Sequence, residues 1–270
     1  MTTSKSMPAI ELEKPIVVMK LGGSMLEQLS DDFIDSLKEL LETKHVIIVH
    51  GGGPDINDML NKLNIKSEFY NGMRKTTKEV LEVVEMILSG KVNKTLTTRL
   101  LQRHLNAFGL SGCDGALITA SFVDKENLGY VGKAEHINDK LLKSILNIGF
   151  VPVISPIGMT ADGKKLNINA DLAAGAIAEQ VKAEQLVFVT NVPGILHEGQ
   201  LVEEATETMI KEWIARGVIY GGMIPKVEAA LSALSDQLEH VMIVNGHARI
   251  LQNGKMIGTK LIKNREVVVE

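Results

Sequence analysis

The stretch IVVMKLGGS at residues 16–24 places a short apolar run directly before two glycines. The stretch VIIVHGGGP at residues 46–54 repeats this arrangement, with three glycines followed by a proline. A short apolar run that ends in glycine is typical of a buried strand, and apolar residues recur at helical spacing after each turn. Pro54 is compatible with the first turn of a helix. Both stretches therefore predict a strand, a glycine-rich turn and a helix, in that order.

The same alternation continues towards the C-terminus and predicts an α/β fold. Strands that alternate with amphipathic helices favour a mainly parallel sheet covered on both faces. We expect hairpin turns at 129–132 and 161–164 and a loose arm at 1–14. Thr76 to Leu88 is apolar on more than one side, so it is either a buried helix or one shared with another subunit. Further strands are expected at 150–154, 186–189 and 241–244, and further helices at 170–181, 206–216 and 222–234.

The composition limits the class of protein. The chain has 270 residues, with 29 Lys and Arg against 33 Asp and Glu, a formal net charge of −4. A content of 45% hydrophobic and 23% charged residues is typical of a globular protein, and the acidic balance argues against a general nucleic-acid coat protein. Cys113 is the only cysteine, which excludes an internal disulfide and a cysteine zinc site. No apolar run is long enough to span a bilayer, and residues 1–15 lack the apolar stretch of a signal peptide, so we expect a cytoplasmic protein.

Several common catalytic and nucleotide-binding motifs are absent from the sequence. It contains no GxxxxGK[ST], which excludes a Walker-type nucleotide loop. The first strand is not followed by GxGxxG, which argues against a Rossmann dehydrogenase. No HExxH or comparable histidine spacing predicts a metal site, and no GxSxG predicts an esterase.

Three glycine-rich segments are candidates for binding an anion. KLGGS at 20–24 and HGGGP at 50–54 follow predicted strands, and GLSGCDG at 109–115 is the third segment. Glycines let main-chain N–H groups converge on an anion because no Cβ blocks its approach, and a helix N-terminus adds positive potential. We expect the first two turns at the carboxyl ends of parallel strands, where open α/β sheets bind ligands. Two such turns, one of them with Lys20, favour an anionic ligand over a purely structural role.

Two further cations and one acid suggest the same kind of ligand. Arg74 suits a carboxylate, because its planar guanidinium donates two parallel hydrogen bonds. Lys226 opens a predicted helix, where its charge is unfavourable beside the positive helix end unless an anion neutralises both. Asp171 begins an alanine-rich helix and either caps it or lies in its first turn. Asn167 and Asn169 lie on one face of the extended segment before that helix.

Taken together, these segments resemble the amino-acid kinase family, and within it the branch that phosphorylates N-acetyl-L-glutamate. KLGGS and HGGG are shared across the family, whereas NGMR and NINAD are typical of that branch. The matching segments occur in family order and span nearly the whole chain after the arm. They are MKLGGS at 19–24, IVHGGGP at 48–54, NGMR at 71–74, GLSGCDG at 109–115, LNINADLAAGAIA at 166–178, TNVPGIL at 190–196 and GGMIPKVEAA at 221–230.

The resemblance implies a three-layer αβα sandwich that is one continuous fold with two lobes. An N-terminal lobe at 15–184 would bind the acetylated amino acid and form a dimer, and a C-terminal lobe at 185–270 would bind the nucleotide. The implied reaction is phosphoryl transfer from MgATP to the γ-carboxylate of N-acetyl-L-glutamate, a step of arginine biosynthesis. Magnesium would be held mainly by the phosphates and water, so we expect no protein metal ligand.

The family pattern also implies roles for individual residues. Lys20 and Lys226 would stabilise the transferring phosphoryl group, and Asp171 would orient both lysines. Many relatives have an aspartate where this chain has Asn191. The acetylated amino acid would be held by Gly52, Gly53, Arg74 and Asn167. The nucleotide would contact Gly22, Gly23, Asn191, Val192, Pro193, Gly194, Ile195, Leu196, Val218, Ile219 and Tyr220.

Two other functions stay open at this point. One is a kinase of a related acidic amino acid such as aminoadipate, because one extra methylene discriminates by only about 1–3 kcal/mol. The other is a non-catalytic nucleotide or arginine sensor, against which the presence of both lysines and of Asp171 argues. Arginine-sensitive relatives carry a longer N-terminal helix. The segment before Lys20 contains Pro8 and Pro15, which argue against such a helix, so we expect an arginine-insensitive homodimer. We expect neither nucleic-acid nor membrane partners.

Overall fold

The computed structural model describes residues 11–25, 29–70 and 72–264. Most of the predicted arm at 1–14 therefore lies outside the described residues, as does Asn71 of the NGMR segment. Among the described residues, the structure has no helix that is both long enough and apolar enough to cross a bilayer.

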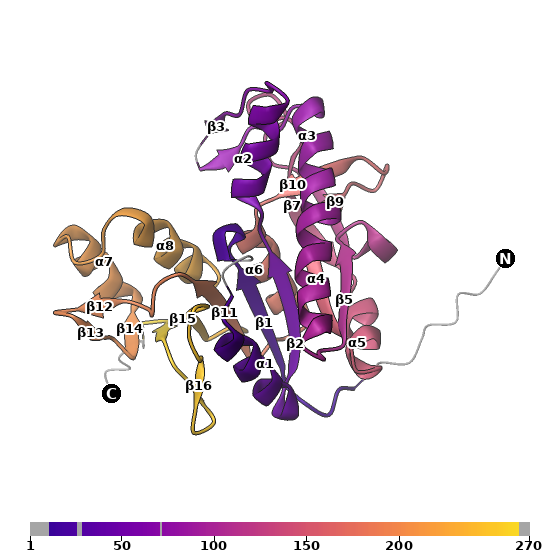
Figure 1. Ribbon diagram of the computed structural model, residues 1–270. Coiled ribbons are helices and arrows are strands. Elements are labelled where there is room, and N and C mark those ends of the chain that lie inside the picture. Colours follow the sequence, from indigo (N-terminus) through magenta and orange to yellow (C-terminus); the bar gives the residue numbers. More distant parts are fainter. Residues whose placement is uncertain (1–10, 26–28, 71, 265–270) are drawn as a thin grey trace.

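An eight-stranded sheet with the order β14-β18-β15-β11-β1-β2-β8-β5 forms the centre of the molecule (Figure 1). Every neighbouring pair in it is parallel except β15 with β18, which confirms the mainly parallel sheet. The strands are β1 Ile16–Leu21, β2 His45–His50, β5 Ala107–Ser111, β8 Val151–Ser155, β11 Gln185–Thr190, β14 Glu204–Thr206, β15 His240–Asn245 and β18 Thr259–Ile262.

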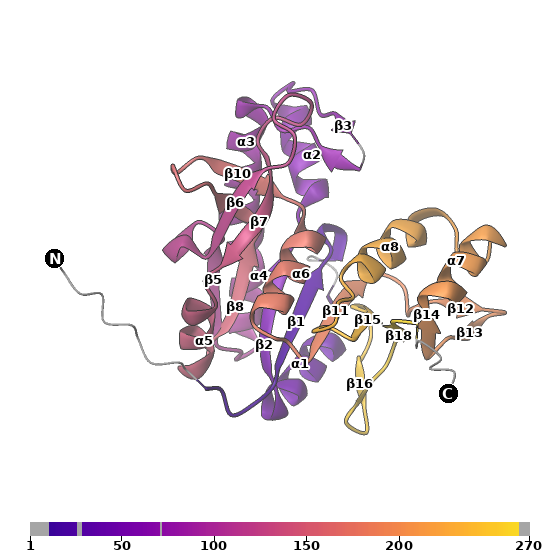
Figure 2. The ribbon, with the colours of Figure 1, turned by 180° about the vertical axis from the view of Figure 1, so that it is seen from behind.

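Helices cover both faces of the sheet, which confirms the three-layer αβα sandwich. Val17, Met19 and Leu21 of β1 pack with α1 to α4 on the face seen in Figure 1. Val18 packs with α5 to α8 on the other face, where Figure 2 shows α6 and α8. The alternation of side chains along a strand thus supplies two separate hydrophobic cores. The helices are α1 Asp31–Thr43, α2 Gly53–Lys62, α3 Lys78–Glu85, α4 Asn93–Gln102, α5 Asp139–Asn147, α6 Ala170–Gln180, α7 Glu207–Ala215 and α8 Ile224–Ser232.

The strands and helices predicted from the sequence are confirmed to within a few residues, and the structure adds elements that the pattern did not reveal. A π-helical segment, Met86–Val92, joins α3 to α4, so the helix predicted to end at Leu88 continues to Gln102. Thr77 caps the N-terminus of α3, and its side chain accepts a hydrogen bond from the N–H of Val80. Most apolar side chains between Thr76 and Leu88 are buried, which favours the buried helix, whereas Met86 is 58% exposed. The buried ones are Val80, Leu81, Val83, Val84, Ile87 and Leu88.

Four short strands form a small closed sheet beside the main one, in the order β10-β7-β6-β9. The turn predicted at 161–164 joins the antiparallel pair of β9 and β10, whereas β6 and β7 are joined slightly earlier than predicted, at 123–130. The remaining hairpins are β3–β4, β12–β13 and β16–β17. The bounds are β3 Phe69–Tyr70, β4 Met73–Arg74, β6 Ile118–Phe122, β7 Val131–Ile137, β9 Ile157–Met159, β10 Lys165–Ile168, β12 Leu196–His197, β13 Gln200–Leu201, β16 Leu251–Gln252 and β17 Lys255–Met256.

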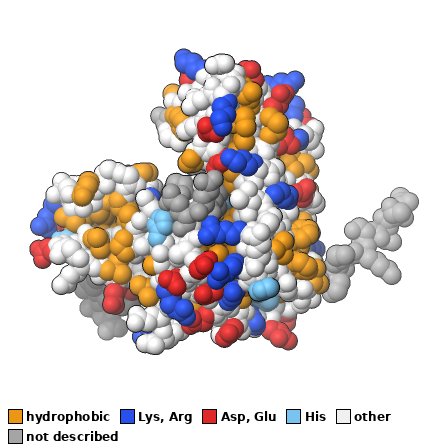
Figure 3. Space-filling view, in the orientation of Figure 1, with side chains coloured by type: hydrophobic (Ala, Val, Ile, Leu, Met, Phe, Trp, Pro, Cys, Tyr) orange, Lys and Arg blue, Asp and Glu red, His pale blue; other side chains and the backbone are white. Residues whose placement is uncertain are grey.

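At and near the edge strand β5, the described residues leave apolar side chains uncovered. Phe108 and Phe150 contact each other edge to face, with ring centroids 6.0 Å apart, and both are exposed. Ile148 at the end of α5 and Leu101 in α4 are exposed as well. Figure 3 shows hydrophobic side chains gathered near β5 and α5, and again over the C-terminal elements. Such a patch at a sheet edge is typical of a contact surface.

The strand order brings three loops together at one edge of the sheet. β1 lies between β2 and β11, with Leu21 opposite His50 on one side and opposite Val189 on the other. Because the three strands are parallel, the glycine turns after β1 and β2 and the loop after β11 all lie at the carboxyl edge. This edge is where the sequence predicted a ligand.

Gly129 connects the small sheet to this edge. Its φ is +70°, and a Cβ on it would lie 2.4 Å from the carbonyl oxygen of Thr76. Gly163 also has a positive φ, +82°, but open space surrounds the position of its Cβ. The two glycines therefore share a backbone conformation and differ in their surroundings.

We expect Gly129→Ala to lower the free energy of unfolding by about 3 kcal/mol, since it adds a clash with backbone to the cost of a left-handed conformation. Gly163→Ala is the matched control and should lose only about 1 kcal/mol. Urea denaturation of both variants measures the difference. Equal losses would contradict the close approach of Thr76.

Candidate functional site

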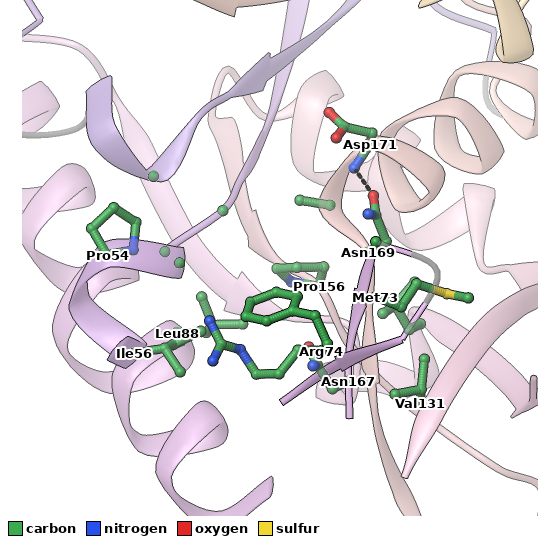
Figure 4. Close-up of a pocket in the computed structure, with 18 of the residues that line it drawn as sticks. Pro54, Ile56, Met73, Arg74, Leu88, Val131, Pro156, Asn167, Asn169 and Asp171 are labelled. Carbon is green, nitrogen blue, oxygen red and sulfur yellow. Dashed lines mark hydrogen bonds between the residues drawn. The ribbon is translucent and has the colours of Figure 1, made fainter. Parts of the chain in front are cut away.

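A cavity of about 350 Å³ opens at the carboxyl edge of the sheet. Its walls come from both glycine turns, from the β3–β4 hairpin, from β10 and from the start of α6 (Figure 4). Arg74 and Asn167 lie at one end of it, and Asn169 and Asp171 at the other. The residues that line it and were predicted as site residues are Lys20, Gly23, Gly52, Gly53, Arg74, Asn167 and Asp171.

Lys20 and Asp171 form an ion pair, with Lys20 Nζ 2.8 Å from Asp171 Oδ1. The helix cap is Asn169, whose side chain accepts hydrogen bonds from the backbone N–H groups of Asp171 and Leu172 at 2.8 and 3.3 Å. Asp171 therefore lies in the first turn, where its charge suits the helix dipole and its carboxylate stays available. Of the two readings of the sequence, the structure selects the first-turn position over the cap.

Arg74 is buried, with only 9% of its surface exposed, and it has no acidic partner within the described part of the chain. Its guanidinium stacks on the Phe69 ring, 4.7 Å from the centroid, and donates to the hydroxyl of Ser67. Burial lowers the pKa of Arg74, yet a guanidinium stays charged at any physiological pH. A buried cation without a counter-ion among the described residues favours an anionic ligand.

Asn167 is held beside Arg74 by a hydroxyl. Its Nδ2 donates to Thr76 Oγ1 at 3.1 Å, and Thr76 Oγ1 in turn donates to the carbonyl oxygen of Arg74 at 2.8 Å. This chain of hydrogen bonds fixes the side-chain amide of Asn167 relative to the backbone of Arg74. Sequence reasoning missed the roles of Thr76, Ser67 and Phe69, because each acts through a contact that no local motif signals.

The two glycine turns touch each other. A Cβ on Gly23 would lie 2.8 Å from the backbone nitrogen of Gly52 and 2.9 Å from that of Gly53. Any larger residue at position 23 would clash with the backbone of Gly52 and Gly53. Glycine at this position therefore lets the two turns pack directly against each other.

A second, smaller cavity of about 130 Å³ adjoins the first and shares Lys20 and Asp171 with it. Lys226 and Asn191 line its far side, and Lys226 Nζ donates to Asn191 Oδ1 at 2.8 Å. Burial, and then the nearby charge of Lys20, lower the pKa of Lys226. Among the described residues Asp171 forms an ion pair with Lys20 and none with Lys226.

Only part of the predicted nucleotide set lines this second cavity, and Gly23 lines the first cavity instead. Asn191 and Gly22 line the second cavity itself. Ile195 and Ile219 are buried in the core and line neither cavity. Tyr220 is 74% exposed. Val192, Pro193, Gly194 and Leu196 follow β11 and continue into β12, and Val218 follows α7.

The chain matches a known family over most of its length. Residues 15–245 match the amino acid kinase family. The chain belongs to this family. It is 55% identical to the acetylglutamate kinase of Geobacillus kaustophilus over 248 residues, which cover 92% of this chain and 96% of that one. It is 48% identical to the acetylglutamate kinase of Bacillus subtilis over 256 residues, which cover 94% and 99%.

The solved structures agree with this assignment. A Streptococcus mutans protein, smu.665, superposes with a TM-score of 0.78 at 32% identity, covering 92% of this chain and 98% of the other. The resemblance to the amino-acid kinase family inferred from the motifs is thus confirmed, together with its fold.

Proposed function

We propose that this family member transfers a phosphoryl group from ATP to the γ-carboxylate of N-acetyl-L-glutamate, giving N-acetylglutamyl 5-phosphate and ADP in arginine biosynthesis. The observation that carries the proposal is the pair of adjoining cavities that share Lys20 and Asp171. One contains an arginine that has no acidic partner among the described residues and suits an amino-acid carboxylate, and the other contains a lysine suited to phosphates. The named relatives, all acetylglutamate kinases at about half identity, support the same activity.

Arg74, Asn167 and the turn at Gly52 and Gly53 would hold the acetylated amino acid. Bidentate hydrogen bonds from the buried guanidinium would bind its α-carboxylate. The amide of Asn167, oriented by Thr76, supplies a neutral polar contact beside it. The γ-carboxylate would then point towards Lys20, at the boundary of the two cavities.

Lys20 and Lys226 would stabilise the phosphoryl group during its transfer. A carboxylate is already ionised at pH 7, so the reaction needs no general base. It needs two anions held in line and positive charge around the moving phosphoryl oxygens. Asp171 would orient Lys20 rather than act as a base, because it is engaged in an ion pair at 2.8 Å.

The second cavity and its surrounding loops would bind the nucleotide, with the lobe at 185–270 as the nucleotide lobe and that at 15–184 as the amino-acid lobe. We propose that Mg²⁺ enters with ATP and is held mainly by phosphates and water. The described residues contain no group of three or more His, Cys, Asp or Glu side chains that fits a metal ion. A cytoplasmic location stays a prediction from the sequence.

We also propose that the chain forms a homodimer through the apolar surface around β5. The exposed Phe108 and Phe150, with Ile148 and Leu101, support this contact because they leave apolar area open to water on an edge strand. Burial of aromatic side chains is the main source of binding energy in such contacts.

Replacement of Lys20 or Lys226 by Met should lower kcat by roughly 10²–10³-fold, since each removes positive charge from the transferring group. Steady-state kinetics with ATP and N-acetylglutamate measure this. Lys62→Met, an exposed lysine paired with Asp58 on α2, is the control and should leave kcat unchanged. A near-normal kcat in either variant would remove that lysine from the mechanism.

The Arg74→Lys variant keeps the positive charge but loses the planar guanidinium that donates two parallel hydrogen bonds. We expect it mainly to raise KM for N-acetylglutamate, by roughly ten-fold, with a smaller effect on KM for ATP. Initial rates over both substrate concentrations separate the two constants. An unchanged KM for N-acetylglutamate would refute the role of Arg74.

A substrate panel tests the activity itself. Hydroxylamine traps acyl phosphates, so the hydroxamate formed from ATP and N-acetylglutamate can be compared with that from N-acetylaminoadipate. We expect the shorter substrate to be preferred by roughly 10-fold or more, the discrimination typical of one methylene. A preference for the longer acid would assign the aminoadipate activity, and ATP turnover independent of any acidic amino acid would contradict both.

The dimer contact is tested with Phe108→Asp, which places a charge in the apolar surface. Light scattering should report a dimer for the original chain and a monomer for the variant. Leu63→Asp, an exposed apolar position at the end of α2, is the control and should stay dimeric. A monomeric original chain, or a dimeric Phe108→Asp variant, would contradict the proposed surface.

A further inference from the structure

His50 is the last residue of β2 and comes directly before the glycine turn, yet none of the steps above uses it. Its side chain is fully buried. Burial is the main cause that lowers the pKa of His50 to about 4, so the ring is neutral at physiological pH. A neutral imidazole has one N–H donor and one nitrogen acceptor, and its hydrogen-bond partners determine whether Nδ1 or Nε2 carries the proton.

The two partners of His50 require one tautomer. Nδ1 lies 2.9 Å from the carbonyl oxygen of Gly51, and a carbonyl can only accept, so Nδ1 carries the proton. Nε2 lies 3.1 Å from the side-chain amide nitrogen of Asn93 and therefore accepts. Protonation of Nε2 would place two donors against each other, which agrees with a ring that stays neutral.

The assignment of the Asn93 amide is itself determined by its surroundings. The same nitrogen is 2.8 Å from the carbonyl oxygen of Val153 and 3.3 Å from that of Leu110. Two carbonyl acceptors require a donor at this position, and the other amide atom accepts from Lys94 Nζ at 3.1 Å. The buried network therefore anchors His50 to α4, β5 and β8 at once.

The hydrogen bond to Gly51 has a consequence for the next residue. In a trans peptide the C=O of one residue and the N–H of the next point in opposite directions. The described residues contain no cis peptide, so the Gly51 carbonyl that turns to the buried ring leaves the Gly52 N–H on the opposite side. Gly52 itself lines the large cavity.

We propose that His50 is a positioning residue for the glycine turn: its Nδ1–H holds the Gly51 carbonyl and thereby keeps the Gly52 N–H directed at the bound anion. Glycine has no side-chain preference to fix this peptide plane, and without the anchor the plane is free to rotate. The identity of the anion, a carboxylate of the acetylated amino acid, rests on the proposed function. The anchoring of the Gly51–Gly52 peptide by His50 does not rest on the proposed function.

The tautomer can be measured on the original chain without any substrate. Imidazole ¹⁵N chemical shifts of histidine-labelled protein distinguish a protonated Nδ1 from a protonated Nε2. We expect Nδ1–H for His50, with no titration between pH 5 and pH 9. The Nε2–H tautomer, or a titration in this range, would overturn the proposal even in a chain that is fully active.

A matched pair of variants tests the consequence for catalysis. In His50→Asn the side-chain amide nitrogen can occupy the position of Nδ1 and keep the hydrogen bond to the Gly51 carbonyl. In His50→Gln the amide nitrogen occupies the position of Nε2 instead, so this hydrogen bond is lost. Asn93 keeps its two carbonyl acceptors in both variants. Loss of the anchor should lower kcat/KM for N-acetylglutamate about ten-fold in His50→Gln, as expected for one lost hydrogen bond.

The expected pattern separates positioning from general loosening of the fold. His50→Asn should stay within about three-fold of the original kcat/KM, and KM for ATP should be unchanged in both variants. Equal losses in the two variants, or a parallel rise in KM for ATP, would contradict the proposal. An original chain that does not phosphorylate N-acetylglutamate would refute the proposed function and leave the tautomer measurement as the test of His50.

Discussion

The ion pair between Lys20 and Asp171 joins the central strand β1 to α6 in the wall between two cavities. It depends on Asn169, because a separate cap residue satisfies the first N–H groups of α6 and leaves the carboxylate to Lys20. It depends equally on the strand order, which sets β2 on one side of β1 and β11 on the other. A single short contact thus links the walls of the two cavities.

Around this pair the charges do not balance. The two cavities are lined by three cations, Lys20, Arg74 and Lys226, and by a single carboxylate, which pairs with Lys20. The other two cations have no acidic partner within the described residues. Buried or half-buried cations without partners cost folding free energy, and this local conflict is typical of a site completed by an anionic ligand. The formal net charge of −4 gives no sign of it, because distant acidic side chains dominate the sum. Charge at the site and charge of the chain are independent quantities.

Much of the fold was predictable because its signal is local. The apolar runs of β1 and β2, and the spacing in α1 and α6, gave these elements to within a few residues. The π-helical segment at Met86–Val92 and the short strands of the closed sheet were missed. A π-helix keeps the composition of a helix while shifting its register, and strands as short as Ile157–Met159 carry too few residues for a period to show.

The sequence by itself determined the strand–glycine–helix units, the anionic character of the ligand and the positions of most cations that face the cavities. Only the tertiary structure decided that Asn169 rather than Asp171 caps α6, that Lys226 meets Asn191, and that His50 binds Asn93. A local pattern reports the few neighbours within one turn or one strand. His50 and Asn93 are 43 residues apart, and Lys226 and Asn191 are 35 apart. Such partners meet only when both faces of the sheet are packed, because that packing selects the order of the strands.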